Sequence, residues 1–356
     1  YLVFYLVLIE QFIINDDYYD ETNIMNKNDL EKTISDFYQE FLLRKPDKTG
    51  LYYFISMIEN GDSTINDVKK LLSESSEAQA IKNYSHYSDK YWNDLQTVVK
   101  YKNKLSTDNE NIHWLYDILT RFKEYLPFEN ILIVGCGNGW LERQLCEMKI
   151  GLHFDAFDIS QKYIDEAKNL SKNMPIDYFI EDINTMSNIE NKKYDAVFNF
   201  AILHHAIDIE NATKRISEVL KPDGLIFNEE YVGPARNQYS DEHLKIMIET
   251  MSDLPPKFRS KHMLRPPLAN FRIEPTEAIH SDLVRPMFEK YFDTIYERNM
   301  NGGIAYQILW NNIENFCDDD PEAIKWLDYL LEKDFEFSEN GKVPILFWNS
   351  VGTPKI

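Results

Sequence analysis

The stretch ILIVGCGNGW at residues 131–140 decides the fold of this chain. Four apolar residues, typical of a buried strand, lead directly into a turn with glycines at 135, 137 and 139. Apolar residues at helical spacing follow over Leu141–Met148. Glycine lets a backbone turn sharply and lie against a ligand without a clashing Cβ atom. The stretch therefore predicts a strand, a ligand-binding turn and a helix, which is the opening unit of a doubly wound sheet.

The residues that follow this turn alternate between strand and helix patterns. Strands are expected at 153–157, 176–180, 194–200, 225–228, 292–298 and 344–350, and helices at 161–172, 211–220, 241–252, 281–290 and about 304–333. Alternation with apolar central strands is typical of an α/β protein with a parallel sheet covered by helices on both faces. We therefore predict a Rossmann-like, doubly wound sheet of seven strands, counting the strand at 131–134.

The spacing of the glycines and of the acids after them indicates the cofactor. A dinucleotide fingerprint needs glycine at position 140, and this chain has Trp140 there, so the turn fits the methionine and ribose parts of S-adenosylmethionine better than a pyrophosphate. Asp158 ends the second strand, where a carboxylate can accept from both ribose hydroxyls, and Asp182 ends the third, where adenine would lie. The candidate cofactor contacts are Gly135, Cys136, Gly137, Asn138, Gly139, Trp140, Asp158, Ile159, Glu181, Asp182, Ile183, Asn199, Phe200 and Ala201.

Two pairs of adjacent polar residues are the catalytic candidates. His204 and His205 follow the fourth strand, and Glu229 and Glu230 follow the fifth, so we expect them to face one cleft. A histidine oriented by a carboxylate can take a proton from a hydroxyl nucleophile. The alternatives are a histidine that only satisfies a loop, and a glutamate that binds a sugar hydroxyl or a divalent metal. Spacing places no clear third metal ligand, so no metal site is expected.

Residues 128–232 resemble the class I S-adenosylmethionine-dependent methyltransferases. The resemblance lies in the segments ILIVGCGNG, FDIS, EDIN, YDAVFNFAILHH and LKPDGLIF, and it implies S-adenosylmethionine as methyl donor and S-adenosylhomocysteine as product. Ile133 departs from the family, which often has an acid at this position that orients the cofactor amine through water. The paired histidines and the acid look like those of sugar O-methyltransferases with an LHH segment.

The residues after Glu230 resemble bacterial and archaeal methyltransferases associated with surface-polysaccharide biosynthesis. From that pattern, Tyr231, Arg236, Gln238 and Arg265 are candidates to line the acceptor site. Arg236 could clamp a carboxylate or a phosphate, or form an interdomain salt bridge. The resemblance implies O-methylation of a sugar or another small hydroxylated metabolite. The alternatives are a nitrogen, sulfur or carboxylate acceptor, or a binding protein without turnover.

A separate helical unit precedes the methyltransferase-like region. Residues 29–82, with the segment FYQEFLLRKPDKTGLYYFISMIENG, resemble the small helical domain called DUF4214, although Phe54 stands where that family usually has Trp. The resemblance implies protein docking and no chemistry. We therefore predict a helical domain at 1–83, a helical lead-in at 84–128 and a methyltransferase domain at 129–356, with acceptor-side insertions at about 232–291 and 300–342.

Composition narrows the partners and the compartment. The net charge of −21 repels phosphate backbones, so nucleic acid is not expected as substrate. Three scattered cysteines without a CxxC pair indicate a reducing compartment without disulfides or a cysteine zinc site. Residues 1–9 are apolar but too short to span a bilayer, and are interpreted as a buried or amphipathic helix or as the end of a lost anchor. We expect a cytoplasmic protein, peripheral to the membrane at most, with a small-molecule or glycan acceptor and homo-oligomers as candidate assemblies.

Overall fold

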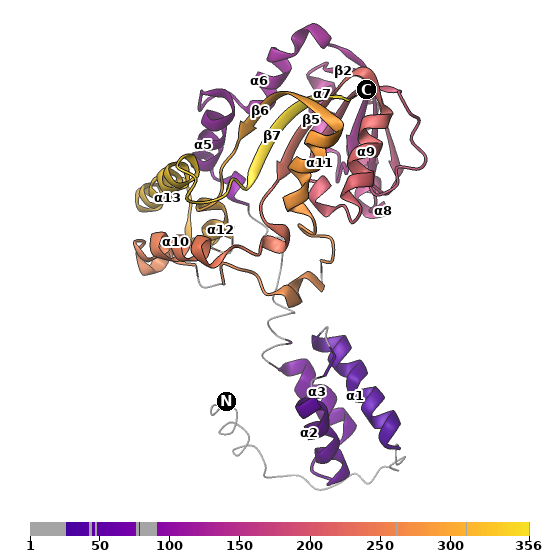
Figure 1. Cartoon of the computed structure of the whole chain (residues 1–356), viewed down its shortest axis with the longest axis vertical. Coiled ribbons are helices and arrows are strands. Elements are labelled where there is room, and N and C mark those ends of the chain that lie inside the picture. Colours follow the sequence, from indigo (N-terminus) through magenta and orange to yellow (C-terminus); the bar gives the residue numbers. More distant parts are fainter. Residues whose placement is uncertain are drawn as a thin grey trace. The chain divides into compact units, whose positions relative to one another are not determined.

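The chain forms two units, Tyr1–Asn83 and Tyr84–Ile356. The computed structural model describes residues 26–42, 45–46, 48–75, 78, 91–260, 263–272, 274–310 and 312–355. The apolar segment 1–9 lies outside the described residues. Each unit has a hydrophobic core of its own. Figure 1 shows the helices and strands of both units.

The first unit contains three described helices, α1 (Lys27–Leu42), α2 (Lys48–Glu59) and α3 (Ile65–Glu74). Apolar side chains recur at helical spacing on α1 and are buried against α2 and α3. The buried set comprises Leu30, Ile34, Tyr38, Leu42, Ile55, Val68, Leu72 and Ala78. Helix α3 begins with a capping box, in which Thr64 and Asp67 bond to each other's backbone N–H. The helices at 29–82 are thus built as the apolar pattern requires.

The second unit is built on one seven-stranded sheet, which confirms the predicted fold class. Its strands are β1 (Phe128–Val134), β2 (Gly151–Asp158), β3 (Ile176–Ile180), β4 (Tyr194–Phe200), β5 (Leu220–Tyr231), β6 (Phe292–Asn299) and β7 (Phe347–Pro354). The strand order is β3-β2-β1-β4-β5-β7-β6. The order reverses between β1 and β4, so a ligand site is expected at the carboxyl ends of these strands.

One strand corrects the expectation of a wholly parallel sheet. Strands β1 to β5 pair in parallel, but β7 pairs antiparallel with both β5 and β6. Figure 1 shows β7, in yellow, between these two neighbours. The chain leaves β6, passes through helices and enters β7 at the same end of the strands. Strand β7 therefore runs antiparallel to β6, and no crossover connection is needed.

Helices cover both faces of the sheet. On one face α6 (Trp114–Arg121), α7 (Trp140–Glu147) and α8 (Gln161–Leu170) bury Ile131 and Ile133 of β1. On the other face α9 (Ile209–Val219) and α11 (Val284–Tyr291) bury the alternate residues Leu132 and Val134. A strand buried on both sides must be apolar at every position, which explains the unbroken apolar run before the glycine turn.

A third core joins the lead-in to the C-terminal insertions. Helix α5 (Gln96–Thr107) lies against α13 (Pro321–Glu339), beside α10 (Asp241–Ser252) and α12 (Ala305–Trp310) (Figure 1). The carboxylate of Asp318 accepts the backbone N–H groups of Gln96 and Thr97 at 2.7 and 3.0 Å, which caps α5 from the insertion. The residues at 91–107 are therefore part of this third core as well as a connection.

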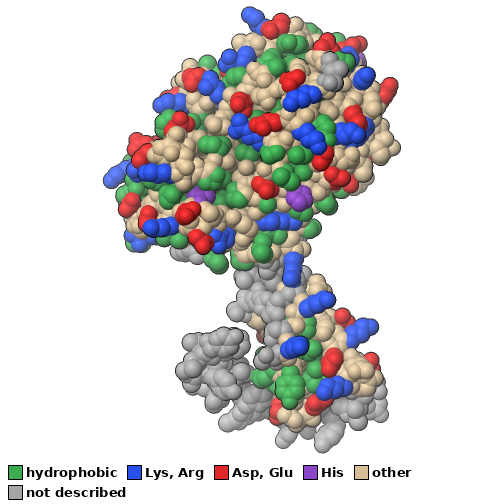
Figure 2. Space-filling view, viewed as in Figure 1, with side chains coloured by type: hydrophobic (Ala, Val, Ile, Leu, Met, Phe, Trp, Pro, Cys, Tyr) green, Lys and Arg blue, Asp and Glu red, His purple; other side chains and the backbone are tan. Residues whose placement is uncertain are grey.

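Short 3₁₀ turns link these elements. They are η1 (Trp92–Asp94), η2 (Lys123–Tyr125), η3 (Leu203–His205), η4 (Ala235–Asn237), η5 (Pro256–Phe258), η6 (Leu268–Arg272), η7 (Ser281–Leu283) and η8 (Ile313–Asn315). Among the described residues, no helix has the length and apolar character needed to cross a bilayer. On the face drawn in Figure 2, described acidic and basic side chains are interspersed over the second unit.

Candidate active site

The glycine turn after β1 has the backbone conformation that the sequence predicts. Gly135, Gly137 and Gly139 have φ angles of +63°, +53° and +78°, a region that other residues rarely adopt. A Cβ atom on Gly135 would lie 2.4 Å from Cγ1 of Ile202, and one on Gly139 would lie 2.6 Å from the Tyr178 hydroxyl. A Cβ atom on Gly137 would meet nothing within 4 Å. Two glycines are therefore required by packing, and Gly137 leaves bare backbone facing open space.

Asp158 lies at the end of β2 beside this turn. Its carboxylate accepts the backbone N–H of Gly137 at 3.0 Å and that of Ser160 at 2.8 Å. A carboxylate has about four acceptor positions, so these two bonds leave capacity for a ligand's hydroxyls. Next to it, Ile159 is 72% exposed and Trp140 is 51% exposed, an unusual degree for large apolar side chains. Bare backbone, a half-buried carboxylate and uncovered apolar surface fit an adenosyl ligand.

The other candidate cofactor contacts take several positions. Glu181 is buried and its carboxylate accepts the N–H groups of Asp182 and Asn188, so it fixes the loop after β3. Burial raises the pKa of the Cys136 thiol, which supports a packing role for that side chain. Ala201 is exposed at the end of β4, with a φ of +55°. Ile183 and Asn138 are half-buried and Phe200 stacks on Trp114 at 5.0 Å.

The structure brings His204, in the turn after β4, together with Glu230, in the last residues of β5. Their side chains are buried, with Nδ1 of His204 2.7 Å from Oε2 of Glu230. The other oxygen of Glu230 accepts the backbone N–H groups of Ile202 and Leu203 at 2.7 and 2.6 Å. It also accepts from Asn199, which faces this pair at 2.9 Å. Glu230 therefore fixes both the imidazole and the turn that carries it.

The electrostatics of this pair follow from its burial and its contacts. Burial alone would lower the pKa of His204, but the charge and the hydrogen bond of Glu230, together with Glu277, outweigh it and raise that pKa above its usual range. Burial likewise opposes ionisation of Glu230, but His204 and the bonds from Asn199 and Leu203 lower its pKa overall. Each member of the pair therefore stabilises the charged form of the other.

Glu229 does not share the cleft of the histidines, and that prediction is corrected. Its carboxylate lies 3.1 Å from the ammonium of Lys102, on α5. Successive side chains of a strand point to opposite faces of the sheet, so adjacent glutamates cannot both face the histidines. Asn228 and Glu230 share one face, since both accept from Asn199, and Glu229 projects to the other.

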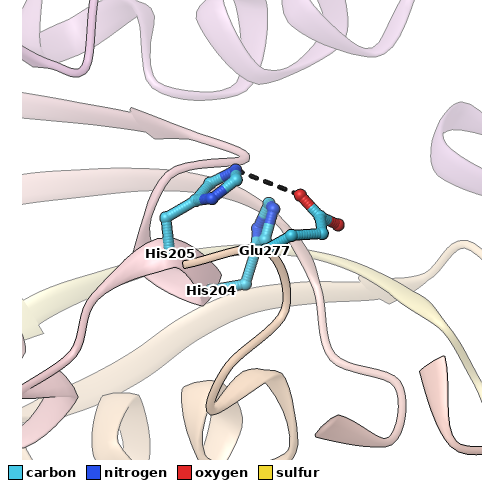
Figure 3. A group of neighbouring side chains, drawn as sticks. All are labelled: His204, His205 and Glu277. Atoms are coloured by element: carbon cyan, nitrogen blue, oxygen red, sulfur yellow. Dashed lines mark ion pairs between the residues drawn. The ribbon is translucent and has the colours of Figure 1, made fainter. Parts of the chain in front are cut away.

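Glu277 is a member of the site that the sequence analysis missed. Its carboxylate lies 3.5 Å from Nε2 of His205, and Thr276 Oγ1 lies 3.4 Å from Nδ1 of the same ring. In Figure 3 the side chains of His204, His205 and Glu277 converge, and their ligand atoms lie within 4.8 Å of one another. The expectation of no metal site rested on the lack of a third ligand, and Glu277 removes that reason. Its segment, EPTEAIH, carries no spacing signal that ties it to the histidines.

The candidate acceptor residues hold loops together in this structure. The guanidinium of Arg236 donates to the carbonyl oxygens of Glu277 and Pro275 at 2.8 and 2.5 Å, and lies over the ring of Phe271. In this structure its guanidinium is engaged by these internal contacts. It locks the segment that carries Glu277 against the histidines.

The other three acceptor candidates also make internal contacts. Gln238 donates to the carbonyl oxygens of Arg236 and Pro266, each at 2.9 Å. Arg265 donates to the Tyr239 carbonyl oxygen at 2.8 Å and to the Asp241 carboxylate at 2.7 Å. Tyr231 is buried, and burial raises its pKa well above the usual range. Its ring meets that of His204 edge to face at 6.1 Å, so it forms part of the wall behind the histidine.

In a comparison with known proteins, residues 132–228 match a family model described as "Methyltransferase domain". Over 105 residues the chain is 34% identical to a ubiquinone biosynthesis O-methyltransferase of Pelagibacter ubique, covering 28% of this chain and 42% of that protein. It is 33% identical over 127 residues to an uncharacterized methyltransferase of Mycobacterium bovis, covering 36% and 62%. Among solved structures, a putative sarcosine dimethylglycine methyltransferase from Galdieria sulphuraria superposes with a TM-score of 0.42 at 14% identity, covering 67% of this chain and 83% of that one.

These matches span less than two thirds of the curated relatives' length. The family match shows a methyltransferase domain over residues 132–228 and, with it, confirms S-adenosylmethionine as the cofactor.

Proposed function

We propose that this chain is an S-adenosylmethionine-dependent methyltransferase that transfers a methyl group to a hydroxyl oxygen of a sugar or another small hydroxylated metabolite. The observation that carries the proposal is the buried His204–Glu230 pair, at 2.7 Å, in the turn that directly follows β4. That turn is continuous with Ile202, which lies against Gly135 of the glycine turn. The base and the donor turn therefore belong to one site.

The residues of the glycine turn and of β2 would hold the donor. Gly137 offers bare backbone, Asp158 offers acceptor oxygens, and Ile159 offers an apolar surface for a purine base. The bound cofactor supplies an electrophilic methyl group on a sulfonium sulfur. The protein then has to hold an acceptor oxygen in line with that group and exclude water.

His204 has the geometry of a general base. Its Nδ1 faces a carboxylate, so the ring is held as the tautomer with the proton on Nδ1 and a lone pair on Nε2. As the acceptor oxygen forms its bond to the methyl carbon and the carbon–sulfur bond breaks, the hydroxyl proton passes to Nε2. His205, paired with Glu277, is the second candidate for this role.

An oxygen acceptor is favoured by the name of the Pelagibacter relative, an O-methyltransferase. The sugar reading is favoured by the resemblance of the LHH segment and of the residues after Glu230 to sugar methyltransferases. A nitrogen, sulfur or carboxylate acceptor is the second candidate, because such acceptors need less help from a base. The His204–Glu230 pair favours the hydroxyl.

A methyl-transfer assay with His204→Gln tests the proposal. Donor binding is first measured by calorimetry, and product formation is then followed with a panel of sugars, nucleotide sugars and amines. We expect the variant to bind the donor as the wild type does and to lose about 10²–10⁴-fold in kcat. His153→Ala is the matched control, because His153 is exposed on β2. A kcat within a few-fold of wild type after replacement of both His204 and His205 would favour the nitrogen or sulfur acceptor.

We also propose that residues 29–82 dock another protein, as their resemblance to DUF4214 implies. The unit has its own buried core, and yet Tyr52 is 71% exposed and Tyr53 is 48% exposed. Adjacent exposed aromatic residues are common in binding surfaces. Replacing both tyrosines by serine should leave methyl transfer unchanged and weaken the binding of any protein partner recovered with the full chain.

A further inference from the structure

We propose that His204, His205 and Glu277 bind a divalent transition-metal ion, with Zn²⁺ as the preferred ion. This inference deepens the proposed function, on which its catalytic meaning rests, but metal binding can be measured without it. The three residues come from two segments, the turn η3 and the loop before η7, that meet beyond the carboxyl ends of β4 and β5. Figure 3 shows their polar groups directed toward a common space.

The distances are close to those of a metal site. One ligand atom from each residue lies within 4.8 Å of the other two, and Nε2 of His205 is 3.5 Å from Oε2 of Glu277. Ligand atoms at about 2.0–2.1 Å from a tetrahedral zinc ion lie about 3.3 Å from one another. Small side-chain rotations would therefore close the group around an ion.

The partners behind the two imidazoles are those that metal-binding histidines need. Nδ1 of His204 is 2.7 Å from the Glu230 carboxylate, and Nδ1 of His205 is 3.4 Å from the Thr276 hydroxyl. Histidine ligands almost always donate their second N–H to a carboxylate, a carbonyl oxygen or water, which fixes the tautomer and the ring orientation. Both rings thus keep Nε2 for an ion.

Charge balance favours a cation at this position. Glu230 is fully buried and Glu277 is 7% exposed, so two buried carboxylates lie beside the two imidazoles. Buried charge is costly unless an opposite charge compensates it. A dication bound by the three residues would compensate both carboxylates.

The donor set selects the class of metal. Two imidazoles and one carboxylate suit Zn²⁺ and other first-row transition metals, whereas Mg²⁺ and Ca²⁺ prefer oxygen ligands. Three protein ligands leave a coordination position open, as in catalytic zinc sites. A hydroxyl bound there would become more acidic and could lose its proton to solvent water before methyl transfer. In the metal-bound form, His204 and His205 would act as ligands, and the ion would take over from an imidazole base the activation of the hydroxyl.

Metal titration of the full chain tests this inference. The protein is dialysed against a chelator, and Zn²⁺ is added in competition with a chromophoric chelator while bound metal is measured by emission spectrometry. We expect one equivalent of tightly bound Zn²⁺ and no comparable binding of Mg²⁺. His205→Ala and Glu277→Gln should each weaken the affinity at least tenfold, and Glu230→Gln by about 10–100-fold. Exposed His153→Ala should change nothing.

His205 is half-buried and Glu277→Gln keeps the side-chain shape, so these variants are expected to fold, which circular dichroism would verify. Equal Zn²⁺ affinity in wild type, His205→Ala and Glu277→Gln would overturn the inference, and so would wild type that binds no stoichiometric metal. Site-specific Zn²⁺ binding by a chain without methyl transfer would uphold the metal site and refute the proposed function. Full methyl transfer by verified metal-free protein would uphold the function and refute a catalytic role for the ion.

Discussion

Substitution of the glycines in the turn after β1 separates packing from ligand binding. Gly135→Ala places a Cβ atom 2.4 Å from Ile202 Cγ1, on a backbone with a φ of +63°. The left-handed conformation costs about 1–2 kcal/mol for a residue with a Cβ atom. Overpacking of a core adds about 1–3 kcal/mol. We therefore expect Gly135→Ala to lower the free energy of unfolding by about 2–5 kcal/mol.

Gly137→Ala is the matched comparison. Gly137 has a similar φ of +53°, but its added Cβ atom meets nothing within 4 Å. Only the backbone cost of about 1–2 kcal/mol applies to stability. The methyl group would instead occupy the open side of the turn, so the affinity for S-adenosylmethionine should fall at least tenfold. A leucine at the same position should abolish donor binding.

Urea unfolding and calorimetric titration measure the two effects. A double-mutant cycle with Ile202→Ala isolates the steric part at Gly135, and we expect a coupling energy of about 1–3 kcal/mol between the two positions. Coupling near zero would contradict the packing argument. A larger stability loss for Gly137→Ala than for Gly135→Ala would refute the packing role of Gly135. Unchanged donor affinity in the Gly137 variants would refute the contact between Gly137 and the donor.

Three further predictions concern buried charge. Burial raises the pKa of Glu142 to about 7, so the folded chain keeps a proton that the unfolded chain releases above about pH 4.3. The stability of the wild type relative to Glu142→Gln, measured by urea unfolding, should therefore fall by up to about 3 kcal/mol as pH rises from about 5 to 7, and level off above. A stability difference between the two proteins that stays constant across this range would contradict the prediction. Glu229→Gln should lower stability by about 1–3 kcal/mol, because it leaves the buried Lys102 without its carboxylate. It should keep kcat within a few-fold, unlike Glu230→Gln. Equal kcat losses for the two variants in a methyl-transfer assay would refute the assignment of Glu230. Asp334 accepts the N–H groups of Gly302, Ile304 and Ala305, so Asp334→Ala should cost about 3 kcal/mol or more in thermal unfolding, and a cost near zero would contradict this clamp.

Much of the fold was predictable because its signals are local. The apolar run at 131–134 is unbroken and 194–200 is largely apolar, since helices cover both faces of the sheet, and the structure has strands there. The direction of β7 was not predictable from such runs. An antiparallel strand with both faces buried has the same apolar pattern as a parallel one, and only its connection distinguishes the two.

The site was predictable where strand ends determine it and not where loops do. His204 follows β4 and Glu230 lies near the end of the neighbouring β5, and the order of the sheet brings them together. The choice between adjacent glutamates depends on which face each residue takes, and a one-residue uncertainty in the strand reverses it. Glu277 reaches the histidines through a loop held by Arg236, a long-range packing contact that no local spacing encodes.

Isothermal titration calorimetry of the full chain with S-adenosylmethionine, in wild type and in Asp158→Ala, tests most directly whether the glycine turn and Asp158 bind the donor. The carboxylate fixes Gly137 and is the expected partner of the ribose. We predict one bound equivalent in the wild type and an affinity at least tenfold weaker in the variant, with the fold retained by circular dichroism. A wild-type chain that does not bind the donor, or a folded variant that binds it equally well, would contradict the role of the glycine turn and Asp158 in donor binding.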